Sequence, residues 1–306
     1  MLRNLNMPHS EAGHTPTATF QGVELYVNDG LLAPTDVVQL RASHPTEPMN
    51  ELYDRYMTDG YLFLKGLLPR ADDLAARESY FTSLAPTGVI QPGTAAVDGI
   101  FNIAATPTNY PGIGAGSLSS LRPEDASTRE QFVEAAIRAH TEPWYCGSEK
   151  ENIAGFCNHE SIRSFVARFT GWGDDTLTVR RTLLRNNTPG NPAIGVHYDQ
   201  LFMRYGEPTS VTAWVPMGDI RVEGGGLIYL EGSETIGQKM EEEFMRRAEA
   251  DGMTRKEKLN AFNANMMSTG FLSTSTRQFA RDHGARWMVT DYEAGDVVLH
   301  RPYMVR

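Results

Sequence analysis

The segment GVHYDQ, residues 195–200, places an imidazole and a carboxylate two positions apart, at His197 and Asp199. Side chains of an extended strand alternate between two faces, so these two residues are expected to point to the same side. One His and one Asp are two of the three protein ligands in the site that holds non-haem Fe(II). The pattern is short enough to arise by chance, and its ordinary interpretation is a solvated pair on a surface strand. The surrounding segments must therefore show whether a metal site is formed.

The sequence after Thr176 is typical of β structure. Short runs rich in Val, Ile, Leu, Thr and aromatic residues are separated there by Gly, Pro and Asn turns. The runs are 176–184, 195–199, 209–217, 225–230 and 296–300. Several short strands without helices between them indicate an antiparallel sandwich or barrel. One stretch, residues 234–267, is rich in Glu, Lys, Met and Ala, and we interpret it as a helical insertion rather than a second domain.

The first half of the chain is predicted to hold helices around one early strand. Apolar spacing and helix-opening residues predict helices over 49–57, 69–84, 127–140 and 159–171, and YLFLKGLL (61–68) is predicted to be a strand. Residues 1–20 are rich in His, Pro, Thr and Ser and are predicted to be a flexible leader. Residues 21–306 are predicted to form a single domain, mainly β with flanking helices.

Composition limits the classes of partner. Hydrophobic residues make up 41% and charged residues 22% of the 306 residues, as in ordinary globular proteins. The net charge is -10 and no Lys/Arg block is present, which argues against nucleic acid and membrane surfaces as partners. No signal-peptide pattern opens the chain, and Cys146 and Cys157 form neither a metal-binding pair nor a disulfide framework. We therefore predict a cytoplasmic protein with a small-molecule partner, and a homodimer is left open.

A longer pattern is more specific than the His-x-Asp pair. TAWVPMGDIRVEGGGLIYLEGSE (212–234) combines a Trp, an acidic turn, a Gly-rich bend and a strand that ends in Gly-Ser. Together with DGYLFLKGLL (59–68), GVHYDQ and EAGDVVLH (293–300), in this order, it resembles the phytanoyl-CoA dioxygenase-like family of Fe(II)/2-oxoglutarate-dependent oxygenases. The resemblance implies a double-stranded β-helix (jelly-roll) core with helices outside. It also implies Fe(II) as the metal, with 2-oxoglutarate and O₂ as cosubstrates.

The resemblance also implies roles for single residues. His197 and Asp199 match the first two iron ligands. Asn186 matches an Asn that faces the cosubstrate, although a turn Asn that binds its own backbone explains it equally well. Trp214 matches an aromatic residue that lines the cosubstrate pocket, and plain core packing is its alternative. Arg204 would suit a substrate carboxylate, but a solvated surface Arg is the better interpretation of this residue.

The third iron ligand is where the sequence departs from the family pattern. The resemblance places this His at, or just past, the last residue, Arg306, and only His300 is available after GDVV (295–298). Three explanations stay open. The natural chain continues further, which we favour because ending here would leave an edge strand unpaired; His300 binds in a shifted register; or the protein is non-catalytic. The Arg that grips 2-oxoglutarate in the family cannot be assigned.

The expected reaction is oxidation of an unactivated C–H bond of a small molecule, by hydroxylation, desaturation or cyclisation. Specialised-metabolite biosynthesis or amino-acid metabolism is the preferred setting, because no basic cluster suited to the phosphates of coenzyme A is present. Two alternatives come from other classes. One is a cupin-type metalloenzyme that does not use 2-oxoglutarate. The other is a non-catalytic jelly-roll binding protein.

Overall fold

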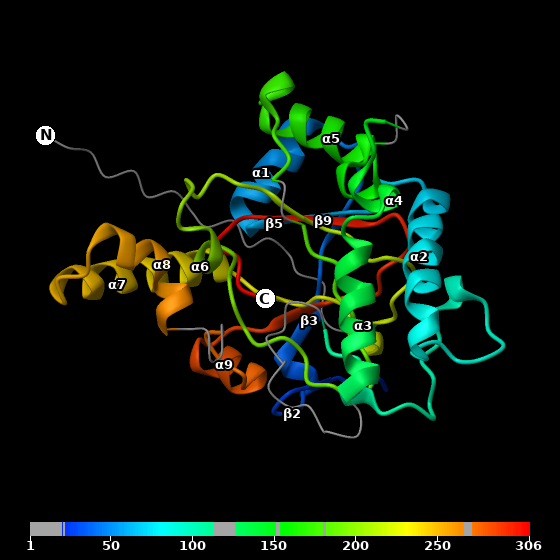
Figure 1. Ribbon diagram of the computed structural model, residues 1–306. Coiled ribbons are helices and arrows are strands. Elements are labelled where there is room, and N and C mark those ends of the chain that lie inside the picture. Colours follow the sequence, from blue (N-terminus) through cyan, green and yellow to red (C-terminus); the bar gives the residue numbers. More distant parts are fainter. Residues whose placement is uncertain (1–19, 21, 113–125, 151–153, 180–181, 266–270) are drawn as a thin grey trace, which may run out of the picture.

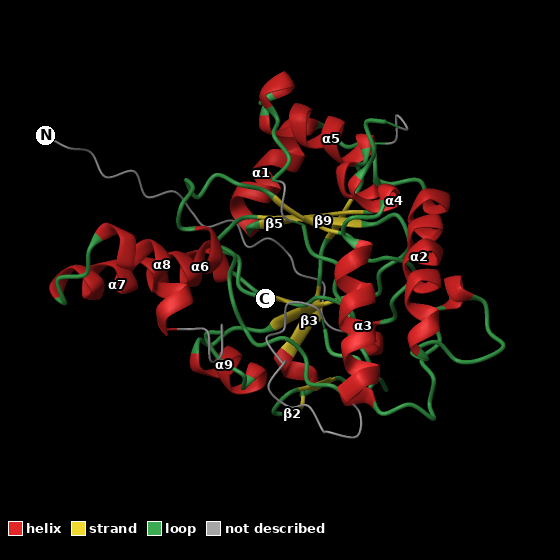
Figure 2. Cartoon of the chain, in the orientation of Figure 1, coloured by secondary structure: helices red, strands yellow, loops and turns green. Residues whose placement is uncertain are grey.

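The structure is a computed structural model, and it describes residues 20, 22–112, 126–150, 154–179, 182–265 and 271–306. The predicted leader, residues 1–20, therefore lies outside the described residues except for Phe20. Helices surround a centre of short strands (Figures 1 and 2). Within the described residues, no helix combines the length and the apolar character that crossing a bilayer requires.

Two small sheets form the centre. The larger sheet has the strand order β4-β5-β9-β6, formed by Ala42–Ser43, Tyr61–Leu64, Val297–His300 and Thr212–Trp214. The smaller sheet has the order β3-β8-β7, formed by Val37–Gln39, Trp287–Val289 and Tyr229–Leu230. A separate hairpin joins β1 (Tyr26–Val27) to β2 (Gly30–Leu31). Strands far apart in sequence thus lie side by side in both sheets.

Alternation along β5 and β9 separates two layers of core. Leu62 and Leu64 of β5, with Val297 and Leu299 of β9, turn outward and pack against helices α1 (Met49–Asp59) and α5 (Glu160–Thr170). The alternate residues turn inward. There Tyr61, Phe63 and Val298 share a cluster with Tyr229 and Met288 of the smaller sheet. The inner faces of the two sheets therefore meet across one apolar layer, and His300 belongs to the same inward-facing set.

The remaining helices cover the flanks. They are α2 (Arg70–Leu84), α3 (Ala126–Ala139), α4 (Pro143–Cys146), α6 (Gln200–Met203), α7 (Ser233–Ala250), α8 (Arg255–Asn265) and α9 (Thr276–Asp282). Helices α1, α2, α3 and α5 confirm the helices predicted over 49–57, 69–84, 127–140 and 159–171. Helices α7 and α8 fall on the segment interpreted as a helical insertion, 234–267, with α7 beginning one residue earlier; residues 266 and 267 lie outside the described residues.

The prediction that the protein is mainly β is wrong. Helix accounts for 43% of the structure and strand for only 12%. Several predicted runs are extended without joining a ladder: the described part of 176–184 has no strand, and 195–199 makes one isolated bridge before α6 begins. Apolar β-type composition predicts an extended backbone, but a strand also needs a partner in register, which composition does not supply. The double-stranded β-helix itself stays a prediction.

Candidate active site

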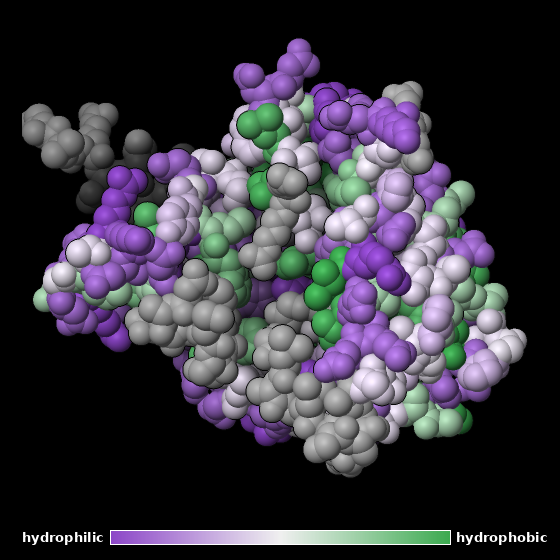
Figure 3. Space-filling view, viewed as in Figure 1, coloured by the Kyte–Doolittle hydropathy of each residue, from purple (hydrophilic) through white to green (hydrophobic). Residues whose placement is uncertain are grey.

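The extended segment that carries His197 lies between two other segments. On one side, Val196 N–H donates to Ser273 O at 2.8 Å and Val196 O accepts from Leu272 N–H at 2.7 Å. On the other side, the backbone of His197 pairs with Arg306. Figure 1 marks the C terminus near the middle of the molecule, and Figure 3 shows that this face is hollowed there. The candidate site therefore lies beside the last residues of the sequence, near the middle of the molecule.

His197 is held as a neutral imidazole. Its Nδ1 lies 2.8 Å from Gly195 O, and because a carbonyl only accepts, Nδ1 carries the proton and Nε2 does not. Burial and the nearby Arg306 charge lower the pKa of His197 to about 3. The rings of Phe202 and Phe271 lie 5.6 and 6.2 Å from the imidazole, centroid to centroid. An unprotonated Nε2 in an apolar surround is the form in which His binds a metal.

Asp199 does not continue the strand as the alternation argument assumed. It is the N-cap of α6 and has helical backbone angles. Its side chain nevertheless turns into the site: Oδ2 accepts from Thr212 Oγ1 at 2.6 Å, and Oδ1 accepts from Arg306 Nη2. Burial alone would raise the pKa of this carboxyl, but the Arg306 charge and the hydrogen bonds around it hold the pKa well below its usual value. The carboxylate is therefore ionised and already bound to a cation.

His300 joins the same group from β9. Its Nδ1 lies 3.0 Å from Tyr229 Oη, and its Nε2 lies 2.7 Å from Arg306 Nη1 and 3.2 Å from Asp199 Oδ2. One nitrogen cannot both accept from the guanidinium and donate to the carboxylate. The guanidinium only donates and its contact is the shorter one, so Nε2 accepts from Arg306 and the proton stays on Nδ1. Burial, together with the Arg306 charge, lowers the pKa of His300 to about 4, which agrees with a neutral ring.

Arg306 stands directly opposite His197. His197 N–H donates to Arg306 O at 2.9 Å, and Arg306 N–H donates to His197 O at 2.9 Å. Two residues that exchange both backbone hydrogen bonds form a directly opposed antiparallel pair, and their side chains share one face. Position 306 is therefore the cross-strand neighbour of His197 on the face of the site. The resemblance had placed a third ligand at, or just past, position 306, but the contact of the Arg306 side chain with Asp199 was not predicted.

The described residues do not supply a third metal ligand of the usual kind. No three His, Cys, Asp or Glu side chains converge among them closely enough to hold one ion. His300 approaches Asp199, but its Nε2 is occupied by Arg306. His300 as a ligand in a shifted register therefore stays a prediction, and it would require Nε2 to exchange its contact with Arg306 for the metal.

The other predicted residues lie on the flanks of this group. Trp214 is two positions from Thr212 on β6 and hence on the same face, and its ring packs against Tyr292 at 4.7 Å between centroids. Asn186 donates its amide to Tyr80 Oη of α2 at 2.8 Å. Neither contact tests a role toward a cosubstrate, so both assignments stay predictions. Thr212 and Tyr229, which position Asp199 and His300, were missed; Thr212 could have been found by alternation from Trp214.

The interpretation of Arg204 as a solvated surface residue is wrong. Its side chain is 4% exposed, and it donates from Nη2 to Glu241 Oε2 of α7 at 2.9 Å. The guanidinium also stacks over the Phe244 ring at 4.0 Å, and Tyr198 Oη donates to the same Glu241 at 2.8 Å. Arg204 therefore anchors α6 to α7, and Glu241 neutralises its charge inside the protein.

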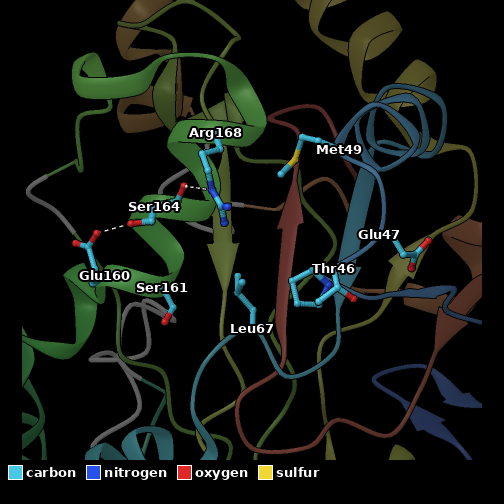
Figure 4. Close-up of a pocket in the computed structure, with 9 residues that line it drawn as sticks. Thr46, Glu47, Met49, Leu67, Glu160, Ser161, Ser164 and Arg168 are labelled. Carbon is cyan, nitrogen blue, oxygen red and sulfur yellow. Dashed lines mark hydrogen bonds between the residues drawn. The ribbon is translucent and has the colours of Figure 1, made fainter.

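An open groove lies on the opposite side of the larger sheet. It has a volume of about 840 Å³ and is lined by Pro45, Thr46, Glu47, Met49, Leu67, Glu160, Ser161, Ser164 and Arg168. Figure 4 shows Ser164 and Arg168 of α5 on one side of it and Met49 and Thr46 on the other. None of the residues that surround Asp199 lines this groove, so it is separate from the candidate site.

Comparison with known proteins decides the family. The phytanoyl-CoA dioxygenase (PhyH) family matches residues 56–305, which is most of the chain. The chain belongs to the phytanoyl-CoA dioxygenase family. A search among curated proteins finds no match. The match includes both sheets apart from β3 and β4, and it includes His197, Asp199 and His300. Membership in the phytanoyl-CoA dioxygenase family indicates an oxygenase, hence an oxidoreductase, and confirms the family assignment made from the sequence motifs.

Proposed function

We propose that the protein is an Fe(II)/2-oxoglutarate-dependent oxygenase that oxidises a C–H bond of a small molecule at the site around His197 and Asp199. One observation carries this proposal. Asp199, beside a neutral His197 with an unprotonated Nε2, is an ionised carboxylate that already engages a cation within the site. This pairing of imidazole and carboxylate suits a ferrous ion, and it occurs inside a family match that covers both residues.

The residues present fit a ferrous ion at two positions. His197 would bind through Nε2 and Asp199 through its carboxylate. The ion pair of Arg306 with Asp199 supports the proposal in that it places a positive charge beside this carboxylate. When bound, ferrous ion with 2-oxoglutarate and O₂ supplies the oxidant for a substrate C–H bond, with succinate and CO₂ as by-products.

The chain's own residues orient these ligands and keep water away. Gly195 O fixes the tautomer of His197, and Thr212 Oγ1 fixes the orientation of the Asp199 carboxylate. Such outer contacts set the direction of a ligand and tune its affinity for a metal. The rings of Phe202 and Phe271 shield the imidazole. Trp214, on the same face of β6 as Thr212, is proposed to line the cosubstrate pocket, and Asn186 is proposed to face the cosubstrate.

The substrate is proposed to be a small molecule of specialised or amino-acid metabolism rather than a coenzyme A ester. The reasons are the net charge of -10 and the lack of a basic cluster in the sequence that would suit the coenzyme phosphates. Hydroxylation, desaturation and cyclisation are the proposed outcomes, and all three begin with oxidation of a C–H bond.

A second candidate function is favoured by one observation. The Arg306 guanidinium lies against Asp199, and among the described residues no three His, Cys, Asp or Glu side chains converge on one point, which suits a non-catalytic binding protein that kept the family's fold. A cupin-type metalloenzyme independent of 2-oxoglutarate has no such support. Its sites draw on several clustered imidazoles, and His197 and His300 do not converge with a third ligand in the described residues.

The test is anaerobic addition of saturating Fe(II) and then 2-oxoglutarate to the full chain, followed by admission of O₂. The oxygenase predicts a visible charge-transfer absorption when 2-oxoglutarate is added, and then succinate. His197→Ala and Asp199→Ala should lose both signals. Asp251→Ala, an exposed carboxylate after α7, is the matched control and should keep them. Full succinate formation by Asp199→Ala would reject the ligand assignment, and iron-independent ligand binding without succinate would favour the non-catalytic alternative.

A further inference from the structure

The cation that neutralises Asp199 is supplied by the chain itself. Arg306 Nη2 donates to Asp199 Oδ1, while Nη1 donates to His300 Nε2 at 2.7 Å. The side chains of Arg306 and Asp199 are only 11% and 14% exposed. We propose that the Arg306 guanidinium occupies the cation position of this site and competes with a divalent metal ion for Asp199.

The backbone register makes position 306 part of the site. Arg306 exchanges two backbone hydrogen bonds with His197, so the two side chains project from one face. A shift of one residue would turn the side chain to the opposite face, where it would meet neither His197 nor Asp199. A histidine at position 306 would therefore bring a second imidazole beside the first. In the part of the chain that the structure describes, this is the place from which a third ligand would come.

The guanidinium of Arg306 and a metal ion cannot both bind Asp199, for electrostatic reasons and because they use the same acceptor atoms. An arginine stays protonated across the whole working pH range, so its charge cannot be removed to admit a second cation. A metal ion on Asp199 would be repelled by this charge at short range in a buried setting. The guanidinium also donates charge-assisted hydrogen bonds to one carboxylate oxygen of Asp199 and to Nε2 of His300. A metal ion that binds Asp199 must displace these hydrogen bonds.

The experiment measures metal binding and not turnover. The full chain, its Arg306→Gln variant and its Arg306→His variant are titrated with Co(II) alone, without 2-oxoglutarate, by calorimetry and by visible absorption. Gln removes the charge and keeps a neutral amide donor on a shorter side chain, whereas His removes the charge and adds a ligand. A change of one outer contact alters metal affinity by roughly 10- to 100-fold. We therefore expect at least about 10-fold tighter binding by Arg306→Gln, and tighter binding still by Arg306→His.

The matched control is Arg301→His. Arg301 lies in the same terminal segment but pairs with Glu234 of α7 at 3.2 Å, away from Asp199. This variant adds an imidazole outside the site, and its Co(II) affinity should equal that of the natural chain. Circular dichroism and the rise of Tm with Co(II) show whether each variant is folded and whether the bound metal stabilises it.

The inference rests on the proposed function only in taking Asp199 as a metal ligand, and the outcomes separate the two. If the natural chain and Arg306→Gln bind Co(II) with equal affinity, Arg306 does not compete with the metal and the inference is overturned, even if Arg306→His binds Co(II) more tightly. Adding Asp199→Ala to Arg306→His should remove the gain. If the gain survives, Asp199 is not a ligand, and both the inference and the proposed function fail.

Discussion

Gly237 in α7 lies directly against the main-chain carbonyl of Tyr303, so that a Cβ at position 237 would fall well inside van der Waals contact with that oxygen. The contact joins α7 to the terminal segment that carries Arg306. Gly→Ala inside a helix normally stabilises it by about 1 kcal/mol. Here the neighbour is backbone, which cannot rotate away as a side chain does.

We therefore expect Gly237→Ala to lower the free energy of unfolding by about 1–2 kcal/mol, because overpacking outweighs helix propensity. It should also displace the segment after Tyr303 and weaken the Arg306–Asp199 contact. Urea denaturation measures the first effect. Gly206→Ala is the control, since its added Cβ would meet only Met203 O at 3.8 Å. A Gly237→Ala protein as stable as the natural chain would contradict the close contact.

Removing Asp199 should leave Arg306 as a buried charge without its carboxylate. We expect Asp199→Ala to lower the free energy of unfolding by about 3 kcal/mol in the metal-free protein, because breaking a buried ion pair costs more than removing both partners. The double variant Asp199→Ala/Arg306→Ala should therefore be more stable than Asp199→Ala alone. Chemical denaturation of the four proteins in the cycle measures the coupling. Strictly additive losses would show that the two side chains do not interact.

Glu241 and Glu243 lie two positions apart on α7 but in opposite surroundings. Glu241 is buried and accepts from Tyr198 and Arg204, whereas Glu243 is on the surface with Arg246 and Arg247. We expect Glu241→Gln to lower the free energy of unfolding by about 3 kcal/mol, because the buried guanidinium of Arg204 loses its counter-charge. Thermal and urea denaturation should show a much smaller effect for Glu243→Gln, since solvent screens exposed pairs. Equal losses would argue against the buried anchor.

Asp73 predicts a pH dependence of stability. This fully buried carboxyl in α2 accepts the N–H groups of Gly218 and Gly295 at 3.1 and 3.0 Å, and burial still raises its pKa to about 6. In the unfolded chain its pKa is about 3.9. Between about pH 4 and pH 6 the folded protein keeps a proton that the unfolded chain releases, so this contribution to stability, about 3 kcal/mol, is present at low pH and lost as pH rises.

Asp73→Asn tests this sign. The amide keeps a carbonyl oxygen for the two backbone donors and does not titrate. Relative to the natural chain, the variant should gain about 3 kcal/mol of unfolding free energy between pH 4 and pH 7. Urea denaturation at a series of pH values measures the difference. Parallel stability curves for the two proteins would mean that Asp73 titrates alike in the folded and unfolded states.

The sequence by itself predicted the longer helices, but not α4, α6 or α9, and it named the residue types of the candidate site. Helices α2 and α5 were predictable because a helix closes its hydrogen bonds within a few residues. Pro69 marks the beginning of α2, and Gly171 marks the end of α5. His197 and Asp199 were recognisable because an imidazole and a carboxylate in this spacing suit ferrous iron. The share of β structure was overestimated because a strand depends on a partner that local sequence does not name.

Only the tertiary structure decided what faces His197. The pairing of Arg306 with His197, and of His300 with Thr212 and Tyr61, joins segments that are distant in the chain, and a slip of one residue would reverse every side chain. The family resemblance pointed to position 306, or just past it, as the place of a third ligand, but nothing in the local sequence predicted that Arg306 pairs with His197. Likewise, Arg204 is polar in any local reading, and only the packing of α6 on α7 buries it against Glu241. Long-range register and packing, rather than residue type, place the guanidinium of Arg306 beside Asp199.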